Sequence, residues 1–256
     1  MDIKEVTFSY DKKRDALHEI DSSIDIGKVT TIIGPNGCGK STLLGVLSNH
    51  LQPQIGDVLL DGKSLAEFKP KELARKLAVV HQQNSAPSDM TVEKLTAYGR
   101  IPYKNLFSSS TDEDEKAIEW ALESTNLLDM RHTPIDSLSG GQMQRVWIAM
   151  ALTQQTPYLF LDEPTTYLDI FYQYELLELI RSLNKQHGIS IVMVLHDINQ
   201  AIKYSDVIIV MKDGRIAAKG NPQDIITADL IRDIYGVNVI VKHDPAAGTY
   251  IVPVGI

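Results

Sequence analysis

The sequence contains little that would cross-link it or anchor it in a lipid bilayer. Cys38 is its single cysteine, so no internal disulfide can form, and a reducing compartment is expected. The longest apolar runs, residues 189–195 and 207–211, are much shorter than the ~20 residues of a membrane-spanning helix. The first residues, MDIKEVTFSYD, are partly acidic and lack an apolar stretch, so we expect no secretory signal.

Basic residues are also scarce. The 25 Lys and Arg residues against 33 Asp and Glu give a formal net charge of −8. This balance argues against a nucleic-acid partner, because such a partner usually requires a basic face. Internal repeats and low-complexity tracts are absent, and the apolar share of 43% with a charged share of 23% is ordinary for a globular protein. We therefore expect a cytoplasmic globular protein with one sizeable domain or two small ones.

The spacing of apolar residues predicts an α/β core interrupted by a helical insert. Residues 3–33 alternate short β-rich runs with polar turns, as in a small antiparallel meander. From about residue 84 to 156 the pattern is helical and more polar. Further strands are predicted at 58–60, 77–80, 158–161, 189–195 and 207–211, and a helix at about 171–187 before Gly188. Continuous apolar strands alternating with helices indicate a mostly parallel sheet that is buried on both faces.

An acidic run, residues 112–115, opens a predicted helix within this insert. Carboxylates in the first turn of a helix complement its dipole. We therefore interpret the run as a solvated helix start and not as a binding site.

The segment GPNGCGKST, residues 34–42, lies between a predicted strand and a predicted helix. It fits the pattern G-x-x-x-x-G-K-[ST] with Gly34, Gly39, Lys40 and Ser41 in the fixed places. Glycines let backbone N–H groups turn around an anion, the lysine can reach β- and γ-phosphates, and the serine hydroxyl can ligate Mg²⁺. Cys38 is interpreted as a small filler. This pattern predicts a nucleotide site but not the reaction that uses it.

Two carboxylates, Asp162 and Glu163, follow the apolar run 158–161 and precede Pro164. The end of such a strand is where ligands bind in α/β folds. A carboxylate engaged by a metal is a poor base, so we assign Mg²⁺ to Asp162 and the attacking water to Glu163. Pro164 keeps a helix from starting at once and holds both side chains at the strand tip.

Two further polar residues follow predicted strands. His196 comes after the run 191–195 and could donate a hydrogen bond to a γ-phosphate, although for a histidine taken in isolation a bond to local backbone is the better interpretation. Gln82 follows the strand 77–80 and could bridge Mg²⁺ and the attacking water. Taken alone, neither residue would indicate a site.

The segment LSGGQ, residues 138–142, precedes a helical run. Ser139 is a good N-cap, and the two glycines expose N–H groups at the positive end of the helix. One γ-phosphate does not need two such cradles from one chain. The pattern therefore predicts head-to-tail pairing, in which the second cradle of one copy faces the nucleotide of the other.

These segments resemble the motifs of the ATP-binding cassette (ABC) ATPases over nearly the whole chain. LSGGQ is similar to their signature, GPNGCGKST to their Walker A and YLFLDE to their Walker B. The resemblance makes Gln82 the Q-loop residue, in preference to Gln83, and His196 the switch histidine. It places Asp169 in the D-loop and identifies Tyr10 with the aromatic residue that stacks on adenine.

The resemblance implies an α/β P-loop NTPase fold with a RecA-like core and an antiparallel β subdomain. It implies one nucleotide-binding domain over residues 1–256, with an α-helical signature subdomain inserted at about 84–156. The cofactors would be ATP and Mg²⁺. Catalysis would fall to Lys40, Gln82, Glu163 and His196, and metal binding to Ser41, Gln82 and Asp162. Nucleotide binding would fall to Tyr10, Gly34, Pro35, Asn36, Gly37, Cys38, Gly39, Lys40, Ser41, Thr42, Ser139, Gly140, Gly141, Gln142 and Asp169.

Three stretches are similar to the ATPases of iron-siderophore, haem and cobalamin importers: YGRIPY at 98–103, QRVWIAMAL at 144–152 and EPTTYLDI at 163–170. Tyr167 stands where alanine is commoner in the family, a departure typical of the siderophore branch. The segment after Asn221 is too short for the regulatory domain of some sugar-importer ATPases.

The resemblance therefore implies the ATP-hydrolysing subunit of an importer for a ferric siderophore or a related metal chelate. It would act as a homodimer at the cytoplasmic face of a bacterial membrane, with separate permease subunits and an extracytoplasmic substrate-binding protein. Haem or cobalamin import stays open as an alternative, as does a soluble ABC ATPase without a transport role. A small-molecule kinase would leave LSGGQ unexplained.

Overall fold

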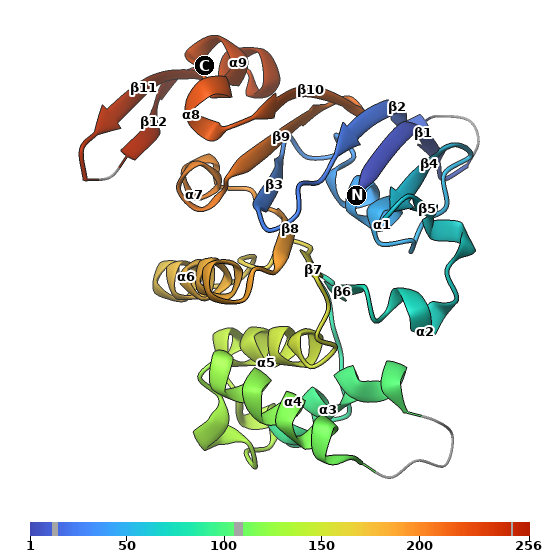
Figure 1. The fold of residues 1–256 in the computed structure, drawn as a ribbon. Helices are drawn as coiled ribbons and strands as arrows, with labels where there is room; N and C mark the ends of the chain where they lie inside the picture. Colours follow the sequence, from blue (N-terminus) through green and yellow to red (C-terminus); the bar gives the residue numbers. More distant parts are fainter. Residues whose placement is uncertain (12–14, 105–109, 247) are drawn as a thin grey trace. The chain divides into compact units, whose positions relative to one another are not determined.

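The computed structural model describes residues 1–11, 15–104, 110–246 and 248–256. They form two compact units, one of Met1–Glu67 with Ser190–Ile256 and one of Phe68–Ile189 (Figure 1). Parts of the predicted meander and insert, residues 12–14 and 105–109, lie outside the described residues. Within these residues, no helix is both long and apolar enough to cross a bilayer. The domain bounds expected from the sequence stay a prediction.

The first unit contains an antiparallel sheet in the order β2-β1-β4-β5, the strand order β10-β9-β3-β8, and the hairpin β11–β12. Its first segment carries β1 (Asp2–Ser9), β2 (Asp15–Ser23), β3 (Val29–Ile33), α1 (Lys40–Leu47), β4 (Ile55–Leu60), β5 (Lys63–Ser64) and η1 (Leu65–Glu67). Its second segment carries β8 (Ser190–Val194), α7 (Ile198–Tyr204), β9 (Val207–Lys212), β10 (Arg215–Gly220), α8 (Pro222–Ile225), α9 (Ala228–Tyr235), β11 (Asn238–Asp244) and β12 (Gly248–Gly255).

The prediction of an antiparallel meander over residues 3–33 is confirmed for β1 and β2 and wrong for β3. Strand β1 pairs antiparallel with β2 and with β4. Strand β3 instead pairs parallel with both β8 and β9. All five residues of β3 are buried, whereas β1 and β2 each include exposed positions. A strand buried on both faces belongs in the interior of a parallel sheet, and this is the environment that β3 occupies.

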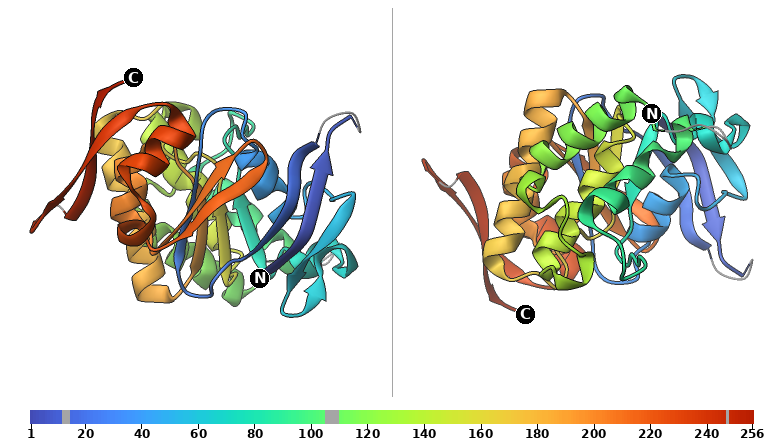
Figure 2. Two further views of the ribbon diagram at one scale, coloured as in Figure 1. Left: turned by 90° about the horizontal axis from the view of Figure 1, so that it is seen from above. Right: turned by 90° about the horizontal axis from the view of Figure 1, so that it is seen from below.

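The C-terminal hairpin β11–β12, red in Figure 2, is hydrogen-bonded to α7 through the Asn199 side chain. The Asn199 side-chain oxygen accepts from the Ile251 N–H at 2.8 Å, and its amide nitrogen donates to the Ile251 carbonyl at 3.2 Å. An isolated two-stranded hairpin is marginally stable, so this paired contact helps to hold it in place.

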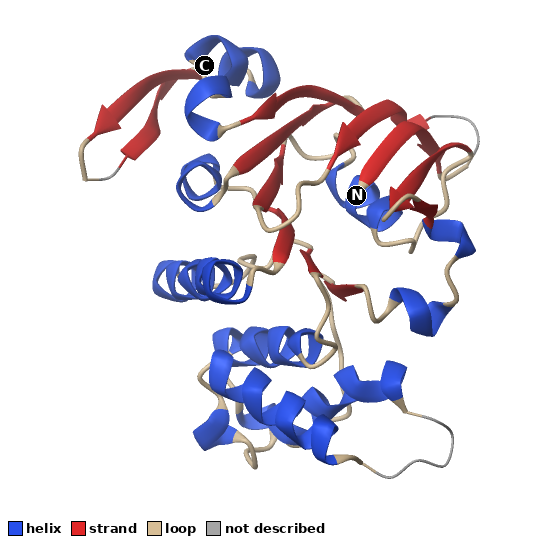
Figure 3. Cartoon of the chain, in the orientation of Figure 1, coloured by secondary structure: helices blue, strands red, loops and turns tan. Residues whose placement is uncertain are grey.

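The second unit is mainly helical between its two strands, as the sequence predicts (Figure 3). It carries α2 (Pro70–Leu73), β6 (Leu77–Val80), α3 (Val92–Ala97), η2 (Tyr98–Tyr103), α4 (Asp112–Ser124), η3 (Leu128–Met130), η4 (Ile135–Ser137), α5 (Gly140–Leu152), β7 (Tyr158–Leu161) and α6 (Ile170–His187). Strands β6 and β7 have the predicted bounds and pair in parallel. Helix α6 ends at Gly188, whose φ of 66° suits a glycine C-cap.

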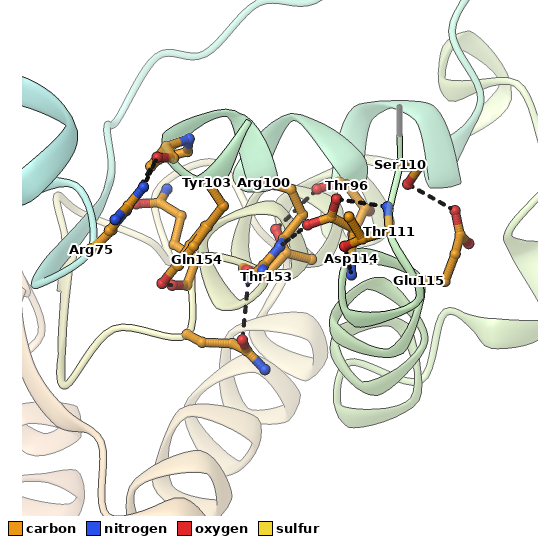
Figure 4. Close-up of polar contacts among 12 residues, drawn as sticks. Arg75, Thr96, Arg100, Tyr103, Ser110, Thr111, Asp114, Glu115, Thr153 and Gln154 are labelled. Atoms are coloured by element: carbon orange, nitrogen blue, oxygen red, sulfur yellow. Dashed lines mark hydrogen bonds and ion pairs between the residues drawn. The ribbon is translucent and has the colours of Figure 1, made fainter. Parts of the chain in front are cut away.

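The interpretation of residues 112–115 as a solvated helix start is incomplete. The run does open α4, and Thr111 and Asp114 form a capping box. Asp114, however, is buried, and Arg100 donates to its carboxylate at 2.8 Å and to the Thr153 carbonyl at 2.8 Å (Figure 4). Burial raises the pKa of Asp114, but the hydrogen bonds from Arg100 and Thr111 lower it by more, so the net shift is downward. Asp114 thus ties the start of α4 to η2 and to the end of α5.

Candidate functional site

The phosphate loop connects β3 to α1, and its glycines adopt conformations that other residues rarely adopt. Gly34, Gly37 and Gly39 have φ values of 153°, 78° and 102°. A Cβ on Gly34 would lie 2.4 Å from the Met211 carbonyl oxygen, and one on Gly39 would lie 2.7 Å from the Ala16 carbonyl oxygen. The first and last of these glycines are therefore required both by the backbone and by close packing.

The start of α1 suits an anion. Gly39 caps the helix without a side chain, and the first turn holds no acidic residue. The N–H groups there and the positive end of the helix dipole face a loop whose Gly37 would carry a Cβ into open space. These observations on the loop itself fit a phosphate group.

Lys40 is buried at the first position of α1, and its ammonium group turns back onto the loop. It donates to the carbonyl oxygens of Gly34 at 2.9 Å and of Pro35 at 3.1 Å. Neither acceptor is charged, so the ammonium keeps its full charge for an anionic ligand. Ser41 follows and is exposed, while Pro35, Asn36 and Gly37 form the outer part of the loop.

Cys38 is buried in the loop, as expected for a filler residue. Burial raises the pKa of its thiol, an effect that the charge of Lys40 reduces. The thiol is therefore protonated at neutral pH and is a poor nucleophile.

Tyr10 lies beside the same helix. Its hydroxyl is 3.1 Å from the hydroxyl of Thr42, which is buried in α1. Its ring meets the edge of Phe8 at a centroid distance of 4.9 Å and is 69% exposed. An exposed ring fixed next to the phosphate loop can stack on a nucleotide base.

The back of the phosphate loop rests on residues that the sequence did not reveal. The Gly214 N–H donates to the Cys38 carbonyl at 3.0 Å, and the Gly214 carbonyl accepts from the His18 N–H at 2.8 Å. The phenol of Tyr235 lies near the Gly34 backbone, and burial raises its pKa. Asp213 and Gly214 follow the predicted strand 207–211, but nothing in the sequence indicates that they pack against the loop.

His196 follows β8, which is the parallel neighbour of β3. Ile32 pairs with Val194, so the loop after β3 and His196 after β8 leave the sheet at the same edge. His196 itself is exposed, and the next residue, Asp197, caps α7 by accepting from the Gln200 N–H at 2.8 Å. The first unit thus brings the predicted histidine to the edge that carries the phosphate loop.

The second unit repeats this arrangement with β6 and β7. Val80 pairs in parallel with Leu161, so Gln82 and the pair Asp162 and Glu163 emerge at one edge. The Gln82 amide nitrogen donates to Glu163 Oε2 at 2.6 Å. Two residues 81 positions apart, predicted separately, are therefore in direct contact.

Glu163 has a left-handed backbone with φ 48°. The Thr166 hydroxyl donates to the same Oε2 atom at 3.1 Å. No role was predicted for Thr166, because an ordinary threonine in a turn gives no signal of one.

The signature segment begins α5 with a capping box. The Ser139 hydroxyl accepts from the Gln142 N–H at 3.3 Å, and the Gln142 side-chain oxygen accepts from the Ser139 N–H at 2.9 Å. This box uses neither the Gly140 nor the Gly141 N–H group. A Cβ on Gly140 would approach nothing closer than 3.9 Å, whereas one on Gly141 would lie 3.1 Å from the ring of Tyr172. Ser139 and Gly140 are exposed, whereas Gly141 is buried.

Asp169 is the N-cap residue of α6, but its side chain makes no capping hydrogen bond. It is exposed and follows Tyr167, which is 89% exposed. The predicted D-loop is thus at the surface of the second unit.

A metal site made of three or more His, Cys, Asp or Glu side chains is not found among the described residues. The predicted Mg²⁺ ligands are of another kind, since Ser41 supplies a hydroxyl, Gln82 an amide oxygen and Asp162 a carboxylate. Oxygen donors of this sort, completed by waters and phosphate oxygens, suit Mg²⁺. The donor set therefore fits the ion chemically.

A groove of about 1060 Å³ lies elsewhere in the second unit, between α4 and α6. Trp120, Phe171 and Tyr174 are among its lining residues, and none of the predicted site residues is. We assign it no part in nucleotide chemistry.

Comparisons with known proteins agree with this reading of the motifs. The model of the family "ABC transporter" matches residues 17–166. The chain is 47% identical to the "Probable siderophore transport system ATP-binding protein YusV" of Bacillus subtilis, over 91% of this chain and 85% of that protein. It is 44% identical to the "Ferric enterobactin transport ATP-binding protein FepC" of Escherichia coli, over 98% of this chain and 93% of that protein.

Among solved structures, the chain is similar to the dimeric ATP-binding cassette MJ0796 in a post-hydrolysis state bound to ADP and Pi. The TM-score is 0.74 at 30% identity, and the match covers 86% of this chain and 98% of the other. The fold is accordingly the α/β P-loop NTPase fold. The chain belongs to the ABC transporter family and is one of its ATP-binding, ATP-hydrolysing cassettes.

Proposed function

We propose that the chain energises uptake of a ferric siderophore, or a related metal chelate, through a separate permease. The observation that carries this proposal is the identity of 47% and 44% to ATP-binding proteins named for siderophore and ferric enterobactin transport. Both matches extend over at least 91% of the chain. In this proposal the ATP-binding subunit does not contact the transported chelate. The assignment to a siderophore importer is therefore supported by the identity to relatives and not by a pocket among the described residues.

In the nucleotide site, Tyr10 stacks on the adenine, and Lys40 with the N–H groups of residues 34–42 binds the phosphates. The buried, uncompensated ammonium group of Lys40 and the acid-free start of α1 support this role. Ser41, Gln82 and Asp162 supply oxygen ligands for Mg²⁺. When bound, Mg²⁺ would screen the negative charge of the phosphates.

Glu163 orients the attacking water and accepts its proton. Gln82 contacts Glu163 directly, which supports a shared task for these two side chains. His196 donates a hydrogen bond to the γ-phosphate from the edge that also carries the phosphate loop.

A second copy of the chain completes the site with Ser139, Gly140, Gly141 and Gln142, and with Asp169. The capping box of α5 leaves two glycine N–H groups outside its own bonds, which supports a ligand from another molecule. The dimeric state of the similar cassette MJ0796 supports the same arrangement. The proposed homodimer lies at the cytoplasmic face of a bacterial membrane, with permease subunits and, through them, an extracytoplasmic substrate-binding protein. No nucleic acid takes part.

The test is a pull-down of tagged Glu163→Gln chain, with ATP, from gently solubilised native membranes. The substitution is expected to keep ATP binding and to lower hydrolysis by roughly 10²–10⁴, as for the loss of a general base. We expect a pair of many-span permease chains to co-purify. Their binding protein would then be titrated with ferric siderophores, haem and cobalamin.

If the binding protein is selective for haem or cobalamin, that ligand and not a ferric siderophore is the cargo. Recovery of ribosomal or DNA-processing proteins without a permease would contradict transport altogether.

A further inference from the structure

The segment between β7 and α6 contains two residues in a strained backbone conformation. Glu163 and Tyr167 have φ values of 48° and 66°, in the left-handed region that residues with a Cβ rarely adopt. Tyr167 is also 89% exposed, so packing of its side chain does not explain its conformation. Strain of this kind persists only where surrounding contacts determine the backbone strongly. The contacts of this segment therefore indicate what holds it.

Thr166 forms two bonds to Glu163. Its hydroxyl donates to Glu163 Oε2 at 3.1 Å, and its N–H donates to the Glu163 carbonyl at 3.2 Å. Gln82 donates to the same Oε2 atom at 2.6 Å. Two donors from different parts of the second unit thus converge on one carboxylate oxygen. Such convergence fixes the rotation of the carboxylate, which a single donor would leave freer.

Gln173, in the first turns of α6, holds the other side of this segment. Its amide nitrogen donates to the Leu168 carbonyl at 2.9 Å and to the Thr165 carbonyl at 3.4 Å. The Leu168 N–H donates to the Thr165 carbonyl at 3.3 Å. The Gln173 side chain therefore holds the turn through carbonyl groups on both sides of Tyr167.

We propose that Thr166 and Gln173 are positioning residues for Glu163. Gln173 fixes the turn 165–168 on α6, and Thr166, which lies in that turn, orients the carboxylate. The turn leads into the exposed residue Asp169, which the proposed second copy of the chain would contact. This inference rests on the proposed role of Glu163 as the base.

Thr166→Val tests the first bond because it removes the hydroxyl at nearly constant shape. Thr165→Val is the matched control, since Thr165 is the buried neighbour and its side chain makes no bond to Glu163. Thr166→Ser is the conservative variant. For each purified chain we would measure kcat and KM for ATP, equilibrium binding of a fluorescent ATP analogue, and the midpoint of thermal unfolding.

We expect Thr166→Val to lower kcat about tenfold, the scale of a hydrogen bond to a charged group, with KM and analogue binding within about twofold of the unchanged chain. Thr166→Ser should restore most of kcat, and Thr165→Val should keep it. A kcat of Thr166→Val within twofold of the unchanged chain would overturn the proposal. So would a loss that Thr166→Ser does not restore, because that would indicate a merely structural role.

Gln173→Met tests the second link, with Gln186→Met as the control on the exposed face of the same helix. We expect Gln173→Met to lower kcat about fivefold, and Gln186→Met to leave it unchanged. If both residues act through one path, the double variant Thr166→Val with Gln173→Met loses no more than Thr166→Val alone. Losses that multiply would show independent effects and would overturn the link between the two residues.

Glu163→Gln, measured in the same series, separates this inference from the function on which it rests. Near-normal hydrolysis by Glu163→Gln would remove the proposed role of Glu163 itself. A large loss in Glu163→Gln with none in Thr166→Val would refute only the positioning of Glu163 by Thr166.

Discussion

The chain has two glycine-rich helix starts, and they use glycine for different reasons. Before α1, Gly34 and Gly39 have positive φ values, and a Cβ on either would strike backbone atoms. At the start of α5, Gly140 and Gly141 are helical residues, and a Cβ on Gly140 would make only an ordinary contact of 3.9 Å with the Leu168 side chain. Helix α1 lacks a side-chain cap, whereas Ser139 and Gln142 form a capping box at α5.

This difference indicates that the phosphate loop before α1 is a complete anion site within one chain, whereas the start of α5 is only part of one. The loop before α1 is enclosed from behind by its own chain, through Met211, Gly214 and Tyr235, and needs only the ligand. The start of α5 is held by its own capping box, which leaves the N–H groups of Gly140 and Gly141 outside its bonds. We infer that the first cradle binds phosphate within one chain and that the second is completed by another molecule.

The largest effect is expected at Gly34. Gly34→Ala would place a Cβ 2.4 Å from the Met211 carbonyl oxygen and 2.6 Å from Cys38 Sγ, so the loop has to move. We expect ATP affinity to fall by at least about a hundredfold, since the positions of several N–H donors depend on this loop. Isothermal titration with ATP measures it.

Gly37→Ala is the control for this substitution, because its Cβ would meet nothing within 4 Å and only its φ of 78° is unfavourable. It should lose much less affinity. Equal losses at both positions would mean that the enclosure behind Gly34 does not matter.

A smaller effect is expected for Gly141→Ala. A Cβ there would lie 3.1 Å from the Tyr172 ring, which has to yield by a few tenths of an ångström. We expect hydrolysis at saturating ATP to fall about tenfold by displacement of the N–H groups of α5, while ATP binding to the isolated chain stays unchanged. A loss of ATP binding would contradict the assignment of the two cradles to separate molecules.

The smallest effect is expected for the stability of the second unit. Ser139→Ala removes the hydroxyl of the capping box, which typically costs about 1 kcal/mol. Urea unfolding should show this loss, with ATP binding to the chain unaffected. A Ser139→Ala chain as stable as the unchanged one would mean that the capping box does not stabilise α5. The start of α5 would then not differ from that of α1 in this respect.

Much of the fold follows from the sequence because local patterns are strong where strands are buried. Strands β6 and β7 were predicted with their observed bounds, and Gly188 marked the end of α6. Strand β3 was grouped with the wrong sheet, since sequence neighbours do not reveal which strands pair. Asp114 was interpreted as solvated because a charge run does not show that one of its carboxylates pairs with a buried arginine, here Arg100 of η2.

The site residues also differ in how far the sequence alone reveals them. Residues with a fixed spacing, such as Gly34, Lys40 and Gly141, could be identified from the sequence. The contact of Gln82 with Glu163 could be expected only as two strand ends at one sheet edge. Thr166, Gln173 and Tyr235 have no motif, because their roles depend on contacts that form after folding. The roles of the site residues in turnover stay predictions.

The most direct test of the two-cradle account is the mass of the chain in solution, measured with the Glu163→Gln variant by light scattering after size exclusion. We expect a monomer of 28.5 kDa without nucleotide and twice that mass with ATP. Adding Ser139→Arg should keep the monomer mass in the presence of ATP, while ATP still binds to the phosphate loop. Dimer formation by the Ser139→Arg chain, or loss of ATP from its monomer, would contradict the account.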